Sequence, residues 1–130
     1  MPFNDPTPAY VADLDPTIAP LAVAFINGLR SVGVPAWISS GRRNAATEAS
    51  LVASGRSTTM HSKHLTGQAF DYDVLGFGRD QLPQWWMLLV GQYGESLGLT
   101  WGGRWTTLYD PGHFQVDVPP SSPAGSSFFA

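Results

Sequence analysis

The sequence of 130 residues contains no cysteine, which excludes disulfide bonds and thiolate metal ligands. A metal site in this chain would therefore be built from nitrogen and oxygen ligands. Charged residues make up only 13% of the sequence, and the formal net charge is −3. Lys and Arg are scattered rather than clustered, so we do not expect a nucleic-acid partner.

Long apolar runs are also missing, because Asn27, Gln84 and Gly91 interrupt the most hydrophobic stretches. The sequence therefore predicts no membrane insertion. The N-terminus lacks the basic and apolar segments of a secretory signal peptide. We expect synthesis in the cytoplasm, so that a target outside the cell would be reached by another route.

Apolar residues are abundant, at 43%, and the length fits one domain with one hydrophobic core. We expect a single domain over residues 1–130 with its core at about residues 14–118. Residues 1–13 contain three prolines and are predicted to form an extended lead-in. Residues 119–130 are rich in Pro, Ser and Gly and are predicted to be a frayed tail.

Apolar spacing, capping residues and alternating segments together predict helices and short strands. Helices are expected from Pro16 to Gly33, with Asp15 as the N-cap, over residues 45–54, with Asn44 as the N-cap, and over residues 83–97. Strands are expected over residues 35–40, 68–74 and 113–118, and a further strand is expected to begin at Thr100. Residues 55–66 are expected to form a loop. Because helices come first and the strands with polar motifs follow, we expect an α+β domain. In this domain a small antiparallel sheet would pack against helices.

Apolar residues at helical spacing define the expected core face of the helix over residues 83–97: Trp86, Leu89, Val90, Tyr93 and Leu97. Most tryptophans are also expected in the core, namely Trp37, Trp86 and Trp101. Trp105 is compatible with the core or with a contact to a sugar or peptide ligand.

Three polar side chains far apart in the sequence form a candidate metal site: His64, Asp71 and His113. Gly67 can turn the chain so that His64 reaches the strand that carries Asp71. A neighbouring antiparallel strand would bring His113 alongside. Two imidazoles and one carboxylate are a three-ligand zinc set with a fourth position for water, which is typical of a catalytic site. Spacing alone leaves open that these are hydrogen-bonded surface or core residues.

Asp110 lies three residues before His113, where a general base could sit, so the arrangement predicts metal-assisted hydrolysis. Asp110 also fits a turn residue within 109–112, and the two roles are compatible. Asp73 shares a strand face with the candidate carboxylate ligand and either supports a ligand histidine or is a solvated charge. His61 is either an exposed loop histidine or a group near the site.

A longer pattern connects these residues, namely Ser62-x-His64-x-x-Gly67-x-Ala69-x-Asp71, then Trp101-Gly102-Gly103 and Asp110-x-x-His113-Phe114. It resembles the M15 zinc peptidases, which include peptidoglycan-cleaving D-Ala-D-Ala carboxypeptidases and L-alanyl-D-glutamate endopeptidases, among them phage endolysins. The resemblance extends from about Leu14 to Val118. It implies the fold shared by D-Ala-D-Ala peptidases and the hedgehog signalling domain. Pro111 stands where some lysostaphin-type relatives have a histidine, which favours the M15 branch.

The resemblance implies roles for five residues. One Zn²⁺ ion would be held by His64, Asp71 and His113, and Asp110 would act as the general base. The turn from Ser40 to Arg43 resembles the family's Ser-Gly-x-Arg turn, which places the substrate-stabilising arginine at Arg43 rather than Arg42. Without the resemblance, Arg43 fits a surface arginine beside a helix.

Within the family, the small domain and the His64-Leu65-Thr66-Gly67 form of the motif favour an L-alanyl-D-glutamate endopeptidase. Its expected substrate is the stem peptide of peptidoglycan. A phage endolysin of this kind, a monomer, would be made in the host cytoplasm, act on the cell wall or periplasm after release, and lyse the host. Two alternatives stay open: a D-Ala-D-Ala carboxypeptidase or dipeptidase, and a non-catalytic zinc-binding module that recognises cell wall or a protein partner.

Overall fold

The computed structural model describes residues 3–55, 62–78 and 81–121. It confirms the α+β class, and the elements follow in this order: α1 (Thr7–Asp13), α2 (Ala19–Ser31), β1 (Ala36–Ser40), α3 (Ala45–Ala53), the 3₁₀ turn η1 (Lys63–Thr66), β2 (Ala69–Val74), α4 (Gln84–Ser96), β3 (Thr100–Trp101), the 3₁₀ turn η3 (Gly102–Arg104) and β4 (His113–Gln115). Residues 56–61 of the predicted loop, including His61, lie outside the described residues.

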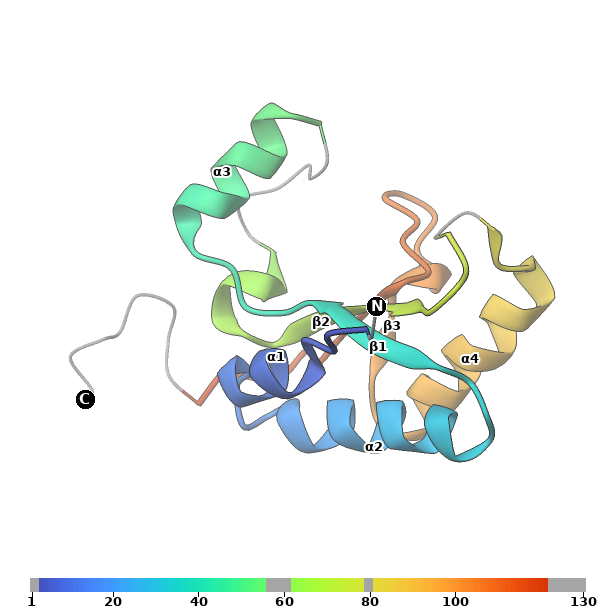
Figure 1. The fold of residues 1–130 in the computed structure, drawn as a ribbon. Coiled ribbons are helices and arrows are strands. Elements are labelled where there is room, and N and C mark those ends of the chain that lie inside the picture. Colours follow the sequence, from blue (N-terminus) through green and yellow to red (C-terminus); the bar gives the residue numbers. More distant parts are fainter. Residues whose placement is uncertain (1–2, 56–61, 79–80, 122–130) are drawn as a thin grey trace.

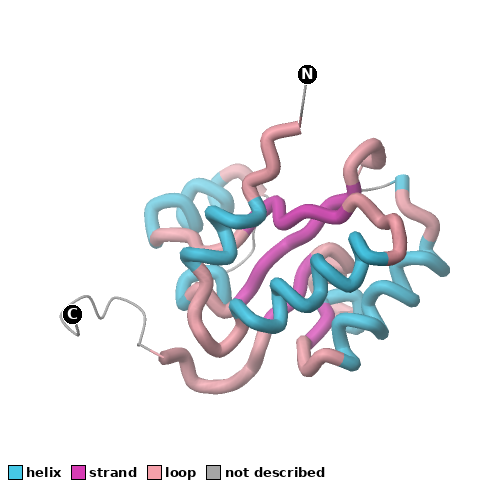
Figure 2. The backbone as a smooth tube through the Cα atoms, turned by 60° about the horizontal axis from the view of Figure 1, so that its bottom comes forward, coloured by secondary structure: helices cyan, strands magenta, loops and turns pink. Residues whose placement is uncertain are grey.

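The strands form one antiparallel sheet in the order β1-β2-β4-β3. Helices α1 and α2 lie below the sheet in Figure 1, and α3 projects from the opposite side. Figure 2 brings the lower side forward and shows helix in front of the strands. One side of the sheet is therefore covered by helices, and the other side is available for a functional site.

An aromatic cluster fills the space between the sheet and α2. Phe25 of α2 contacts Phe70 and Tyr72 of β2 and Phe114 of β4, with ring centroids 4.7–5.7 Å apart. Side chains alternate along a strand, so the residues next to these aromatics point away from the helices. Asp71, His113 and Gln115 thereby share the other face of the sheet.

The lead-in predicted over residues 1–13 is wrong, because Thr7–Asp13 form α1. Pro6 and Pro8 stand at the beginning of this helix. Backbone N–H groups in a first helical turn have no partner within the helix, so proline, which lacks an N–H, is tolerated there. The buried Thr7 ties α1 to the sheet, since its hydroxyl accepts a hydrogen bond from the backbone N–H of Ile38 at 2.9 Å.

Two predicted boundaries also need correction. Residues 16–18 form a turn, and α2 begins at Ala19, although the Asp15 carboxylate accepts a bond from the Thr17 backbone N–H as a cap would. The last strand ends at Gln115 rather than at residue 118. Beyond it, Val116 and Val118 bond instead to the backbone and side chain of the buried Gln68.

The core face of α4 differs from the predicted one. Of the predicted residues, Val90 is buried and Trp86, Tyr93 and Leu97 pack against the core, but Leu89 is 57% exposed. Met87, Gly91 and Gly94 are buried in addition. The two glycines are the reason, because they let aromatic rings of the sheet approach the helix. A Cβ atom at Gly91 would lie 2.3 Å from the Trp101 ring, and one at Gly94 would lie 2.3 Å from the Phe114 ring. Trp101 is buried as expected, whereas Trp37 and Trp86 are half-buried.

The predicted tail is attached to the domain at its start. The buried Asp15 carboxylate accepts bonds from the backbone N–H groups of Thr17 and Ser121. Burial alone would raise the pKa of Asp15, but these bonds and those from the two hydroxyls hold it below its ordinary value. Residues 119–121 are thus held in place by an ionised carboxylate, and residues 122–130 lie outside the described residues.

Gly91→Ala is expected to destabilise the protein by about 1–3 kcal/mol, because the added methyl group overpacks the contact with Trp101. Urea unfolding measures the change. The exposed neighbour on the same helix supplies the control, and Gln92→Ala should change the free energy of unfolding by less than about 0.5 kcal/mol. Equal stability of Gly91→Ala and wild type would contradict the close packing of α4 on β3.

Asp15→Asn is expected to lower the free energy of unfolding by about 1–2 kcal/mol at pH 7, because the variant loses charge-assisted hydrogen bonds. The pKa of Asp15 is lowered in the folded protein, so its contribution is complete above the unfolded pKa of about 3.9 and disappears as pH falls through the folded pKa. Urea unfolding at pH 7 and at successively lower pH should show the two proteins converging. Asp13→Asn, at an exposed position, should show no such difference.

Candidate metal centre

A tight turn delivers His64 to the sheet. The Ser62 hydroxyl accepts a hydrogen bond from the backbone N–H of His64 at 3.1 Å and so begins η1. Gly67 ends this turn with φ of +75°, a left-handed conformation that favours glycine. A Cβ atom there would also lie 2.6 Å from the Arg42 guanidinium. Two residues of the sequence motif therefore shape the backbone around the histidine.

The His64 side chain is 2% exposed, and its two ring nitrogens face different partners. Nδ1 lies 2.6 Å from the backbone carbonyl oxygen of Gly41. A carbonyl can only accept, so Nδ1 carries a hydrogen, and in the neutral imidazole that binds a metal the lone pair is on Nε2. Nε2 is directed at Oδ2 of Asp71, at 3.5 Å.

Asp71 and His113 are direct partners across the β2–β4 ladder. The Oδ1 atom of Asp71 lies 3.2 Å from Nδ1 of His113, and the rings of the two histidines have centroids 5.1 Å apart. All three side chains are buried, and each offers one ligand atom within 4.8 Å of the others. The register of two strands and one glycine turn thus gather residues from positions 64, 71 and 113.

This group fits a zinc ion. Tetrahedral coordination with bonds of ~2.0–2.2 Å separates ligand atoms by about 3.3–3.6 Å. His113 Nδ1 lies 3.2 Å from one Asp71 oxygen and His64 Nε2 lies 3.5 Å from the other, each at or close to that separation, and all three ligand atoms lie within 4.8 Å of one another. The donors are also the imidazole and carboxylate groups that zinc accepts when no cysteine is available.

The electrostatics of the centre favour an ionised carboxylate. Burial alone would raise the pKa of Asp71, but hydrogen bonds and charge attraction from His113 and His64 hold it far below its ordinary value. Burial alone would lower the pKa of His113. Bonds to Asp71 and Gln115 and the charges of Asp71 and Asp110 instead raise it. The centre therefore attracts positive charge, which is the condition for binding a cation.

Arg43 reaches the centre, and its neighbour does not. The Arg43 guanidinium donates to Oδ2 of Asp71 at 3.3 Å and to the Ser40 hydroxyl at 3.1 Å. A bulge in β1 between Ile38 and Ser40 precedes this turn and redirects the chain there. Arg42 instead donates to the backbone carbonyl of Asp13. The placement agrees with the choice of Arg43 over Arg42, and the role of Arg43 remains a prediction.

Asp110 lies in the turn that leads into β4. Its backbone carbonyl accepts a bond from the His113 N–H, and its own N–H donates to the Gly102 carbonyl, both at 3.1 Å. A Cβ atom at Gly102 would lie 2.4 Å from the Asp110 carbonyl oxygen, so the glycine permits this contact. The turn role of Asp110 is confirmed, and its charge lies close enough to raise the pKa of His113. Its role as a base remains a prediction.

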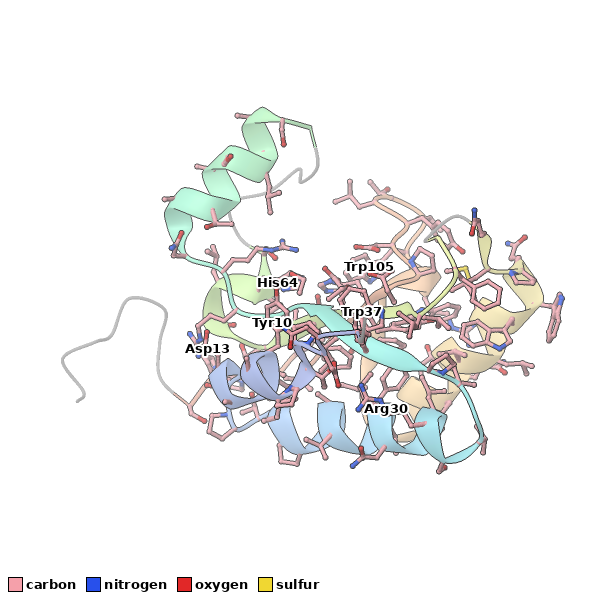
Figure 3. The ribbon with its side chains drawn as sticks, in the orientation of Figure 1. Tyr10, Asp13, Arg30, Trp37, His64 and Trp105 are labelled. Atoms are coloured by element: carbon pink, nitrogen blue, oxygen red, sulfur yellow. The ribbon has the colours of Figure 1, made fainter. Side chains whose placement is uncertain are left out.

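Further side chains surround His113. The half-buried Trp105 ring has its centroid 5.2 Å from the His113 ring. Figure 3 shows Trp105 and His64 on the side of the sheet opposite α2. Sequence reasoning missed Gln115, whose Oε1 atom lies 2.8 Å from Nε2 of His113. Its position two residues after His113 on one strand was the available signal. Asp73 is half-buried opposite Trp37 on β1.

Comparison with known proteins agrees with this geometry. A family model described as D-alanyl-D-alanine carboxypeptidase, within the M15 peptidases, matches residues 55–116. The L-alanyl-D-glutamate peptidase of Listeria phage A118 is 34% identical over 98 residues, which are 67% of this chain and 32% of that protein. The chain thus spans about a third of the length of this curated relative.

A solved structure resembles nearly the whole fold. The crystal structure of the Serratia marcescens L-Ala D-Glu endopeptidase ChiX matches with a TM-score of 0.66 and 29% sequence identity. The match covers 88% of this chain and 89% of that one. Together with the family model and the phage relative, it confirms the resemblance inferred from the sequence pattern. The chain belongs to the M15 family of peptidases.

Proposed function

We propose that this chain is a zinc-dependent peptidoglycan endopeptidase that cleaves the L-alanyl-D-glutamate bond of stem peptides. The buried group of His64, Asp71 and His113 carries this proposal. Two similar proteins, one from a phage and one from Serratia marcescens, are named for the same bond. The similarity of this chain to the phage protein supports a role as an endolysin in host lysis.

The three side chains would hold one Zn²⁺ ion through Nε2 of His64, a carboxylate oxygen of Asp71 and Nδ1 of His113. When bound, the ion would lower the pKa of water and polarise the scissile carbonyl. The protein contributes a buried, preformed ligand set, and its hydrogen bonds to Gly41 and Gln115 orient the two imidazoles.

Asp110 and Arg43 supply the remaining chemistry. The Asp110 carboxylate accepts a proton from the attacking water and delivers it to the leaving amine. The Arg43 guanidinium stabilises the negative charge that develops on the carbonyl oxygen of the substrate. The contact of Arg43 with Asp71 and the charge of Asp110 near His113 support these roles.

The expected site of action is the bacterial cell wall. We propose a monomer that is made in the host cytoplasm and reaches peptidoglycan after release. None of the helices within the described residues is long and apolar enough to cross a bilayer.

A D-Ala-D-Ala carboxypeptidase or dipeptidase is the second candidate, because the matching family model carries the carboxypeptidase description. Mass spectrometry of digested peptidoglycan separates the two. New N-terminal D-glutamate supports the endopeptidase, and released D-alanine supports the carboxypeptidase. Absence of any product, with zinc bound and the wall retained on the protein, would indicate a non-catalytic recognition module instead.

The wild-type protein is expected to bind one zinc ion per chain, measured by elemental analysis after dialysis. His64→Ala and His113→Ala should lose the ion, because each removes one of three protein ligands. Glu95→Gln, which alters a carboxylate that bonds to Arg104, should keep it. Full zinc content in both histidine variants would show that the metal is bound elsewhere.

Asp110→Asn is expected to reduce kcat on peptidoglycan by roughly 10²- to 10⁴-fold while zinc content stays at the wild-type value, because the variant loses only proton transfer. Release of soluble stem-peptide fragments measures the rate. Asp13→Asn provides the carboxylate control at an exposed position. A wild-type rate in Asp110→Asn would mean that another group accepts the proton.

A further inference from the structure

His113 is held at both ring nitrogens by side chains. Nδ1 faces Oδ1 of Asp71 at 3.2 Å, and Nε2 faces Oε1 of Gln115 at 2.8 Å. His113 and Gln115 are two residues apart on β4, so their side chains lie on the same face of the sheet. Gln115 thus contacts the nitrogen that points away from the candidate metal position.

A polar chain determines which way the Gln115 amide points. Its Nε2 group donates to Oδ1 of Asp117 at 2.6 Å, and Oδ2 of Asp117 accepts a bond from the Thr100 hydroxyl at 2.7 Å. The carboxylate oxygen of Asp117 is the acceptor, so the NH₂ group of Gln115 faces Asp117 and its carbonyl faces His113. The register supports the chain, because Thr100 pairs with Gln115 across β3 and β4.

The amide orientation in turn sets the tautomer of His113. A carbonyl oxygen at Nε2 requires a hydrogen on that nitrogen. Without a metal, Nδ1 also carries a hydrogen when it donates to Asp71, but the neutral imidazole that binds a metal then has its lone pair on Nδ1. Nδ1 is the nitrogen directed at Asp71. The opposite holds for His64, in which the Gly41 carbonyl fixes the hydrogen on Nδ1 and leaves Nε2 toward Asp71.

We propose that Gln115 is a positioning residue that holds His113 as the Nε2–H tautomer with Nδ1 ready to bind the metal. Asp117 and Thr100 fix the orientation of the Gln115 amide. This role rests on the proposed metal site, and it requires no contact between Gln115 and either metal or substrate.

The first test compares zinc affinity by competition with a chromogenic chelator. Gln115→Leu keeps a similar volume and removes both polar partners, so zinc affinity should fall by about 10- to 100-fold. Gln115→Glu restores an acceptor for the Nε2 hydrogen and should recover most of the lost affinity. Gln92→Leu makes the same substitution at an exposed position of α4 and should leave affinity unchanged.

The second test observes the hydrogen itself by NMR of ¹⁵N-labelled, zinc-loaded protein. The Nε2 proton of His113 should be visible and slow to exchange in the wild type and in Gln115→Glu, and lost to solvent exchange in Gln115→Leu. Asp117→Ala, which leaves Gln115 in place but frees its amide to rotate, should weaken zinc binding less than Gln115→Leu does. Thermal unfolding of the metal-free variants checks that each is folded.

The outcomes separate this role from the proposed function. Wild-type zinc affinity in Gln115→Leu, with the Nε2 proton unchanged, would overturn the role of Gln115 and leave the metal site intact. Failure of Gln115→Glu to recover affinity would also overturn it. A wild-type protein that binds no zinc would overturn the metal site and this role together.

Discussion

The pairing of Asp71 with His113 across β2 and β4 is the constraint on which the rest of the structure depends. The adjacent pair in the same ladder, Phe70 with Phe114, lies wholly in the core. One register therefore sends two aromatic rings to the helices and two candidate metal ligands to the opposite face. A slip by one residue would bury the polar pair among aromatics and expose the rings, so burial of Phe70 and Phe114 also enforces the geometry of the site.

Burying an ionised carboxylate is costly unless other groups compensate for the lost water. Asp71 is 5% exposed, and its two oxygens face His64, His113 and Arg43. Burial alone would raise the pKa of Asp71, but the hydrogen bonds and charges of His113 and His64 hold it low. The low pKa also means that a cation entering the centre meets a carboxylate that is already ionised and oriented, which reduces the reorganisation needed for binding.

The residues of the candidate site could be predicted from the sequence better than the helices that pack behind it. His64, Asp71 and His113 could be grouped because a glycine turn and strand alternation are local rules, and the motif constrains their spacing. The helix at Thr7–Asp13 was missed because prolines indicate extended chain except in a first helical turn. The contribution of Gly91 and Gly94 to the buried face of α4 was missed because glycines add nothing to hydrophobic periodicity, yet they admit Trp101 and Phe114. Such contacts depend on the partner surface, which a single segment does not reveal.

The two histidines are oriented by partners of different kinds, so different substitutions disturb their orientations. His64 bonds to the Gly41 carbonyl, so its orientation depends on the backbone path, on the η1 turn and on Tyr10, which lies against Gly41. No single side-chain deletion removes that acceptor. His113 bonds at Nε2 to the side chain of Gln115, which one substitution eliminates.

Arg43 adds a further link, because its backbone N–H donates to the His64 carbonyl while its guanidinium contacts Asp71. Backbone changes around residues 41–43 must therefore disturb His64 and Arg43 together, whereas His113 can be perturbed alone.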